Sequence, residues 1–224
     1  MILRVRAPFA AFRPFLAGSF RGTACVMPPS AAYGLVLNLA SIDARDPMSP
    51  GPTRYRKDAP SLRLAVGVVS SGTVASLYQQ IHGYRVGDSG NELASRTHGA
   101  KYGIAPVRRE IVVDFDGAIA FESDGGEVEE RVASALAGTS REPRYGLPFA
   151  GDNNLMFDRI EVCPSLDARW AERVAPEAAN IRNTVRLPCR IDRDDQSRTD
   201  IGLFSVSDDV TGSPPAAAWV VVGP

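Results

Sequence analysis

The residues best suited to chemistry lie in a glycine-rich stretch at 82–106, where basic and aromatic side chains are interleaved. Aromatic rings stack on nucleic-acid bases, and arginine and lysine bind phosphates. The stretch therefore has the composition of a surface for single-stranded nucleic acid, although an ordinary solvated hairpin could have the same composition. The candidate contact residues are His82, Tyr84, Arg85, Arg96, His98, Lys101 and Tyr102.

Cysteine and histidine do not indicate a metal site. Cys25, Cys163 and Cys189 are far apart in the sequence, and His82 and His98 are the only histidines. A structural zinc site needs four such ligands, usually at short local spacings, and three separated cysteines do not make a disulfide framework. We therefore expect neither a metal nor another cofactor.

Charge is distributed unevenly along the 224 residues, although the formal net charge is only −1. Residues 1–109 hold 14 Arg and Lys against 5 Asp and Glu, an excess of nine positive charges. Residues 110–224 hold 11 against 21, an excess of ten negative charges. Basic surfaces dominate binding to polyphosphates, so the first half is the candidate nucleic-acid face. The two halves could equally neutralise one another across an internal contact.

The N-terminal sequence predicts a strand followed by a helix. Apolar and polar side chains alternate over residues 2–12, which is typical of a strand with one buried face, and Pro8 should weaken or end its pairing. After a loop, two prolines and Ser30 precede an apolar run at 31–42. These features predict a helix of about three turns with Ser30 as its N-cap.

Further strands and helices follow a proline-rich connector at 43–60. They are a strand at 62–69 that stays extended to 81, a long hairpin or lid at 82–106, a strand at 109–121 with Asp116-Gly117 as a candidate turn, an amphipathic helix at 126–138, a strand at 155–163, a short helix at 166–174, and strands at 185–191 and 219–222. Two strand pairs, each joined to a helix, are typical of a ferredoxin-like α+β sandwich. We therefore expect a domain at 1–160 and a smaller β-rich extension at 161–224 packed on it.

Candidate phosphate contacts lie around the first helix and beside a later strand. Arg13 and Arg21 stand in the loop before the helix, and Ser30 at its start would leave backbone N–H groups free to bind a phosphate. Ser30 could also be a plain helix cap. Arg108 and Arg109 adjoin a strand edge and could equally be structural.

A glycine-rich segment at 145–154 offers a second candidate. Its Gly146, Gly151, Asp152 and Asn153 could form a tight turn that lets a nucleic-acid backbone approach closely. The same residues could simply connect a helix to a strand.

Three segments together resemble the CRISPR-associated Cas-five family, in the branch often called DevS. In that family a first strand leads through a loop to a P-S-x-x-x-G-L helix start, and residues 29–35 read PSAAYGL. Residues 106–121 (PVRREIVVDFDGAIAF) resemble its third core strand, and residues 143–154 (PRYGLPFAGDNN) resemble its glycine-rich motif. The resemblance covers roughly residues 1–160 and depends on the order and spacing of these motifs.

The resemblance implies an RRM-like fold of the RAMP superfamily with a protruding thumb hairpin, here at about residues 78–104. It also implies a subunit of a type I Cascade complex, a ribonucleoprotein of antiviral defence, which holds the 5′ handle of the guide RNA (crRNA). The expected protein partners are the backbone subunit and the large subunit, with target DNA near the PAM end as a further candidate. The RNA-binding residues would be Arg13, Arg21, Ser30, Arg108 and Arg109 together with the seven residues of the glycine-rich stretch.

The sequence departs from the branch of this family that cuts precursor guide RNA with a tyrosine, a lysine and a histidine. Ala40 stands where that tyrosine is expected, and Arg141 and Arg144 stand where the lysine and histidine are expected. General acid–base cleavage needs a group that titrates near neutrality, and only His82 and His98 are of that kind. We therefore expect a protein that is not an enzyme.

Two alternatives stay open at this point. One is a metal-independent endoribonuclease that uses His82 or His98 with Lys101 to process precursor guide RNA. The other is a protein–protein scaffold with no RNA contact of its own.

The N-terminal segment is apolar, but Arg4, Arg6 and Arg13 interrupt it, so it does not have the core of a signal peptide. An apolar run of about 18 residues, which a membrane span would need, is absent. We therefore expect a cytoplasmic protein with no membrane contact.

Overall fold

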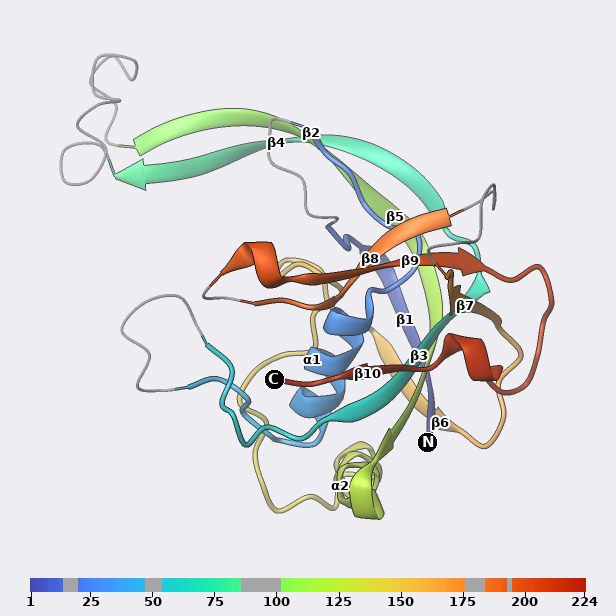
Figure 1. The fold of residues 1–224 in the computed structure, drawn as a ribbon. Coiled ribbons are helices and arrows are strands. Elements are labelled where there is room, and N and C mark those ends of the chain that lie inside the picture. Colours follow the sequence, from blue (N-terminus) through green and yellow to red (C-terminus); the bar gives the residue numbers. More distant parts are fainter. Residues whose placement is uncertain (14–19, 47–53, 86–101, 176–183, 193–194) are drawn as a thin grey trace.

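Ten strands form one sheet, antiparallel in all but one pairing, in the part of the chain that the structure describes (Figure 1). The structure is a computed structural model. It describes residues 1–13, 20–46, 54–85, 102–175, 184–192 and 195–224. With two α-helices, the architecture is of the α+β class that the sequence predicts.

The centre of the sheet has the order β6-β1-β5-β3. These strands are β1 (Ile2–Ala10), β3 (Leu62–Ser70), β5 (Tyr102–Ser123) and β6 (Arg159–Cys163). Helix α1 (Pro29–Leu39) lies between β1 and β3 in the chain, and α2 (Glu127–Leu136) lies between β5 and β6. The alternation predicted for β1 is confirmed, since Leu3, Val5 and Ala7 are buried on one face.

Pro8 weakens the pairing of β1, as expected, but it does not end the strand. The register of β1 and β5 passes from Ala7 opposite Phe115 to Phe9 opposite Val113. The β5 residue between these partners, Asp114, has a φ of 57°. The ladder is therefore locally irregular at the position where proline has no N–H to donate.

The prediction of a turn at Asp116-Gly117 is wrong. Both residues lie inside β5 and are paired with β1 and β3. Arg4 binds the Asp116 carboxylate through Nε at 3.0 Å and Nη2 at 2.6 Å. An Asp-Gly pair makes a hairpin only where the chain can reverse, and here strands on both sides hold it straight.

The second half of the sheet curls over α1. Strand β7 (Arg169–Arg173) pairs with β3, β9 (Asp200–Val206) pairs with β7, and β8 (Thr184–Arg190) forms the far edge. Strand β10 (Val220–Val222) also pairs with β3, and both β8 and β10 contact α1. Helix α1 is therefore buried on almost every side, which agrees with the apolar run that predicted it.

The prediction of a short helix at 166–174 is also wrong, because this segment contains β7. Pairing with the edge of β3 places Trp170 opposite Gly67. A Cβ at Gly67 would lie 3.1 Å from the Trp170 ring, which is tighter than most Cβ contacts, so glycine favours this packing. Tertiary pairing has overridden local helix propensity here. In the part of the chain that the structure describes there are also three short 3-10 turns, at Asp124–Gly126, Gln196–Arg198 and Ala216–Ala218.

A long two-stranded ladder extends from one end of the sheet (Figure 1). Strand β4 (Thr73–Arg85) pairs with the first half of β5, from Thr73 opposite Val113 to Arg85 opposite Tyr102. The short strand β2 (Phe20–Arg21) runs parallel to β5 beside Arg108 and Arg109. Residues 86–101, which connect β4 to β5, lie outside the described residues.

Candidate nucleic-acid interface

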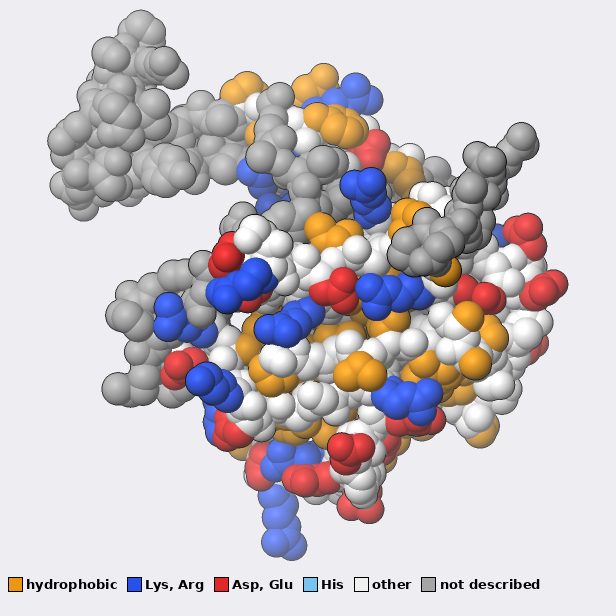
Figure 2. Space-filling model, viewed as in Figure 1, with side chains coloured by type: hydrophobic (Ala, Val, Ile, Leu, Met, Phe, Trp, Pro, Cys, Tyr) orange, Lys and Arg blue, Asp and Glu red, His pale blue; other side chains and the backbone are white. Residues whose placement is uncertain are grey.

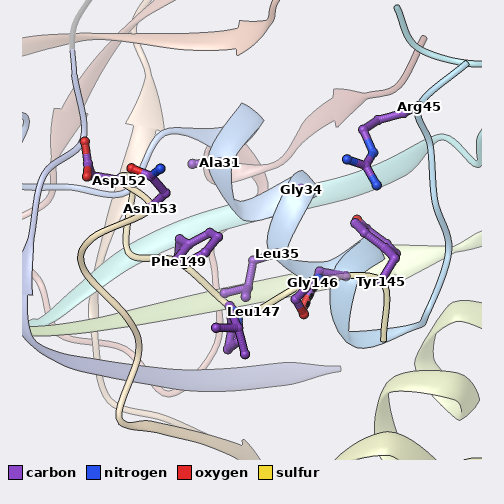
Figure 3. A pocket seen from close by; sticks show the side chains of 13 residues that line it. Ala31, Gly34, Leu35, Arg45, Tyr145, Gly146, Leu147, Phe149, Asp152 and Asn153 are labelled. Carbon is purple, nitrogen blue, oxygen red and sulfur yellow. Dashed lines mark hydrogen bonds between the residues drawn. The ribbon is translucent and has the colours of Figure 1, made fainter. Parts of the chain in front are cut away.

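A groove of about 610 Å³ lies between α1 and the glycine-rich segment 145–154 (Figure 3). Ala31, Gly34 and Leu35 of α1 form one side, and the glycine-rich segment forms the other. Arg45 and Tyr145 lie at one end of the groove, and Asp152 and Asn153 lie at the other. The groove therefore joins two of the segments that the sequence singled out.

Main-chain contacts with the end of β1 fix the glycine-rich segment. The Ala11 N–H donates to the Ala150 carbonyl at 2.9 Å. Gly151 follows with a φ of 83°, and a Cβ there would lie 2.3 Å from the Ala11 carbonyl oxygen. Only glycine allows this approach, so its position in the motif has a local physical cause.

A buried ion pair connects this segment to the sheet. Arg109 Nη2 of β5 lies 2.7 Å from Asp152 Oδ2, and the two side chains are 7% and 9% exposed. Arg109 Nη1 also donates to Gln79 Oε1 of β4 at 3.2 Å. Burial alone would raise the pKa of Asp152, but the Asn154 N–H and the Arg109 guanidinium hold that pKa below its usual value.

Arg109 is therefore not available to bind RNA, although the sequence analysis gave it as a candidate RNA-binding residue. Its guanidinium is buried, and both of its terminal nitrogens are bound to neighbouring side chains, so a structural role describes Arg109 better. Arg108, one residue earlier, is exposed, as is Arg13, and Arg21 is half-buried. These three remain candidates for phosphate contact.

An aromatic ring and a cation form one end of the groove. The Arg45 guanidinium lies over the Tyr145 ring, 5.2 Å from its centroid. An ion pair with Asp43 holds it there, with Arg45 Nε 2.8 Å from Asp43 Oδ1. Burial, with Asp43 nearby, raises the pKa of Tyr145. Asn38 of α1 donates to the Gly146 carbonyl at 3.1 Å and ties the segment to the helix. The sequence interpretation missed Arg45, Asn38 and Tyr145, because their positions in the sequence do not reveal that they meet.

Ser30 is not the N-cap of α1. Pro28 occupies that position, its carbonyl accepts the N–H groups of Ala31 and Ala32, and no side chain caps the helix. Pro29 at the first helical position presets the helical φ angle and explains the shift. The first turn of α1 thus begins beside the groove without an acid or a side-chain cap.

Four of the other predicted contact residues lie in the β4–β5 ladder. His82, Tyr84, Arg85 and Tyr102 lie in the two strands, where the structure describes the backbone alone. Arg96, His98 and Lys101 lie outside the described residues. The structure therefore places the first four along one ladder and leaves the other three unplaced.

No family model and no curated protein matches the sequence. The structure resembles a chain of a CRISPR RNA-guided surveillance complex, with a TM-score of 0.56 and 18% identity, over 97% of this chain and 91% of that one. The chain has the fold of a CRISPR surveillance-complex subunit. At the level of fold this confirms the resemblance that the sequence motifs predicted.

Two further structures are weaker matches. A Cas protein has a TM-score of 0.44 and 14% identity, over 94% of each chain. A Type III-B Cmr-beta complex bound to cognate target RNA and AMPPnP contains a chain with a TM-score of 0.43 and 10% identity, over 93% of this chain and 85% of that one.

Among the described residues, no group of three or more His, Cys, Asp or Glu side chains could hold a metal ion. Within the same residues, no helix is long and apolar enough to cross a membrane.

Proposed function

We propose that the protein is a non-catalytic subunit of a CRISPR Cascade complex that binds and caps the 5′ handle of the guide RNA. The observation that carries this proposal is the groove beside the start of α1. It combines the positive end of a helix, a cation over an aromatic ring, and an open side at Gly34. The fold shared with a surveillance-complex subunit supports the same role.

In the groove, the physical roles divide between phosphate and base. The N-terminus of α1 and Arg45 favour a phosphate, and Tyr145 and Phe149 offer rings against which a base can stack. Gly34 has no atom within 4 Å of where its Cβ would lie, so the helix leaves space for a flat group. The exposed Arg13 and the half-buried Arg21 would add sequence-independent attraction.

The sheet and its long ladder support a domain type and a set of partners for the proposed subunit. The strand order β6-β1-β5-β3 with two connecting helices supports a ferredoxin-like, RRM-like domain of the RAMP type. The β4–β5 ladder would be the thumb that clasps the guide. The backbone subunit and the large subunit would be the neighbours, with target DNA near the PAM end as a further contact.

The proposal assigns no catalysis to the chain. Ala40 is buried at the end of α1 and has no acid–base group, and Arg141 and Arg144 are exposed arginines in place of a lysine and a histidine. The three positions of the cleaving branch therefore carry no acid–base pair.

A substitution at Gly34 tests the groove. Gly34→Gln should raise the free energy of unfolding by about 0.5–1 kcal/mol, because glycine is a poor residue inside a helix. The longer side chain should fill the groove and weaken binding of labelled handle RNA at least about tenfold, which corresponds to about 1.4 kcal/mol. Fluorescence anisotropy measures the affinity, and urea unfolding measures the stability.

Ala133→Gln on α2 is the matched control, because its side chain is exposed away from the groove; its affinity should equal that of the wild type. A more stable Gly34→Gln protein with unchanged affinity would contradict the proposed site.

Incubation of the wild-type protein with repeat RNA without metal tests the absence of catalysis, and a gel should show uncut RNA. Cleavage that is lost in a His82→Ala, His98→Ala variant would instead support the endoribonuclease alternative.

A further inference from the structure

Three side chains from three strands form a row on one face of the local sheet β2–β5–β4. Phe20 of β2 and Tyr78 of β4 are both register partners of Arg108 in β5. Side chains of directly opposed residues project to the same face and are neighbours. We call Phe20, Arg108 and Tyr78 the stacking row.

The stacking row is presented to solvent, whereas the opposite face is used for packing. Tyr78 is 80% exposed and Phe20 is 48% exposed, and Arg108 is exposed between them. The next register, Arg21, Arg109 and Leu77, is buried or half-buried. Figure 2 shows hydrophobic and basic side chains side by side on the surface over β2, β4 and β5. The exposed rings contribute little to the core, so the fold does not account for them.

The charges around Arg108 decide in which direction a bound chain of phosphates would extend from the stacking row. Arg108 has no carboxylate partner among the residues that the structure describes. On one side of it, Glu110 accepts the Thr23 N–H at 3.2 Å and would repel a phosphate. On the other side, Gln80 and Pro106 are exposed register partners without charge. A chain of phosphates would therefore extend over Gln80 and Pro106, toward the far end of the ladder.

We infer that the stacking row is a second, base-stacking site for single-stranded RNA, separate from the groove. This inference rests on the proposed function. Neighbouring strands lie about 4.8 Å apart, so the two rings are roughly 10 Å apart and one base cannot touch both. Each ring stacks on its own base, and Arg108 binds the phosphate between them.

Single-stranded RNA fits the row better than an apolar protein surface does. A protein would have to bury Arg108 against a carboxylate of its own, because an unpaired buried charge is costly. RNA supplies flat bases and phosphates in every nucleotide. Stacking reads no base edges, so the row should bind RNA of any sequence with similar strength.

The test uses the full-length chain with two fluorescent probes, the handle RNA and an unrelated single-stranded RNA of equal length. Tyr78→Ala and Phe20→Ala should each weaken binding about 5- to 100-fold for both probes. Tyr78→Phe, which keeps the ring, should bind like the wild type. Arg108→Ala should lower the slope of log affinity against log salt by about 0.7. Arg186→Ala, an exposed arginine of β8, should leave that slope unchanged.

The outcomes separate this inference from the proposed function. If the wild type binds neither probe, the proposed function fails and the inference falls with it. If Gly34→Gln weakens binding but the row variants bind like the wild type, the inference alone is overturned. Row variants that bind RNA normally but fail to assemble with other Cas subunits would show a protein interface and would also overturn it.

Discussion

Two adjacent arginines show how far residue-scale reasoning reaches. Arg108 and Arg109 are equivalent in the sequence, yet one is exposed and the other is buried against Asp152. Strand alternation predicts that they face opposite sides. It does not predict which side is buried, because β5 buries side chains on both of its faces, as the neighbouring Ile111 and Val112 show. Only the assembled sheet settles their roles.

Asp152→Asn tests the buried pair. At neutral pH this variant should be about 3 kcal/mol less stable than the wild type, because Arg109 keeps a buried charge without its counter-ion. The folded-state pKa of Asp152 lies below its usual value. The stabilisation is therefore present above the unfolded-state pKa of about 3.9 and is lost as the pH falls through the folded-state pKa.

Urea unfolding at a series of pH values measures this difference, which should be constant near neutrality and shrink in acid. The exposed Asp209 offers a control, since Asp209→Asn should change stability by less than about 0.5 kcal/mol. Equal stability of Asp152→Asn and the wild type at pH 7 would contradict the assigned role of the pair.

At the scale of elements, the glycine-rich segment depends on one backbone conformation. Gly151→Ala should destabilise the protein by about 1–3 kcal/mol, because its φ of 83° is strained for alanine and its Cβ would collide with the Ala11 carbonyl. RNA binding at the groove should fall as well, since the segment can no longer lie against β1. Thermal unfolding and anisotropy measure the two effects.

Gly146→Ala provides the comparison within the same segment. Its Cβ would have only one contact, with Asn38 Nδ2 at 3.7 Å, an ordinary distance. Its stability should stay within about 0.5 kcal/mol of the wild type. If both variants are equally stable, the positive φ of Gly151 does not shape the groove.

The elements themselves were predictable where a local pattern decides them. Alternation in β1, the apolar run of α1 and the amphipathic pattern of α2 all led to the observed elements. The prediction was wrong where a partner decides, as in β7, which is a strand because β3 offers an edge. The groove was only half predictable, because Arg45 and Tyr145 are a hundred residues apart in the sequence.

At the scale of the whole molecule, the charge asymmetry acquires a structural meaning. The basic first half of the sequence supplies α1, Arg45, β2 and Arg108, which border the groove and form the stacking row. Many acids of the second half are used internally, as Asp116 is by Arg4 and Asp152 is by Arg109. Internal neutralisation is therefore present, and the exposed Arg13 and Arg108 are left for the RNA contacts that we propose.

The most direct test of the central claim is to identify the RNA that the protein holds. The full-length chain, tagged and expressed in its own host, would be isolated with its assembly under gentle salt, and the bound RNA would be sequenced. We expect short RNAs that share one repeat-derived 5′ handle, recovered together with other Cas subunits. Recovery of no RNA, or of fragments without a common 5′ sequence, would contradict the role proposed for this protein.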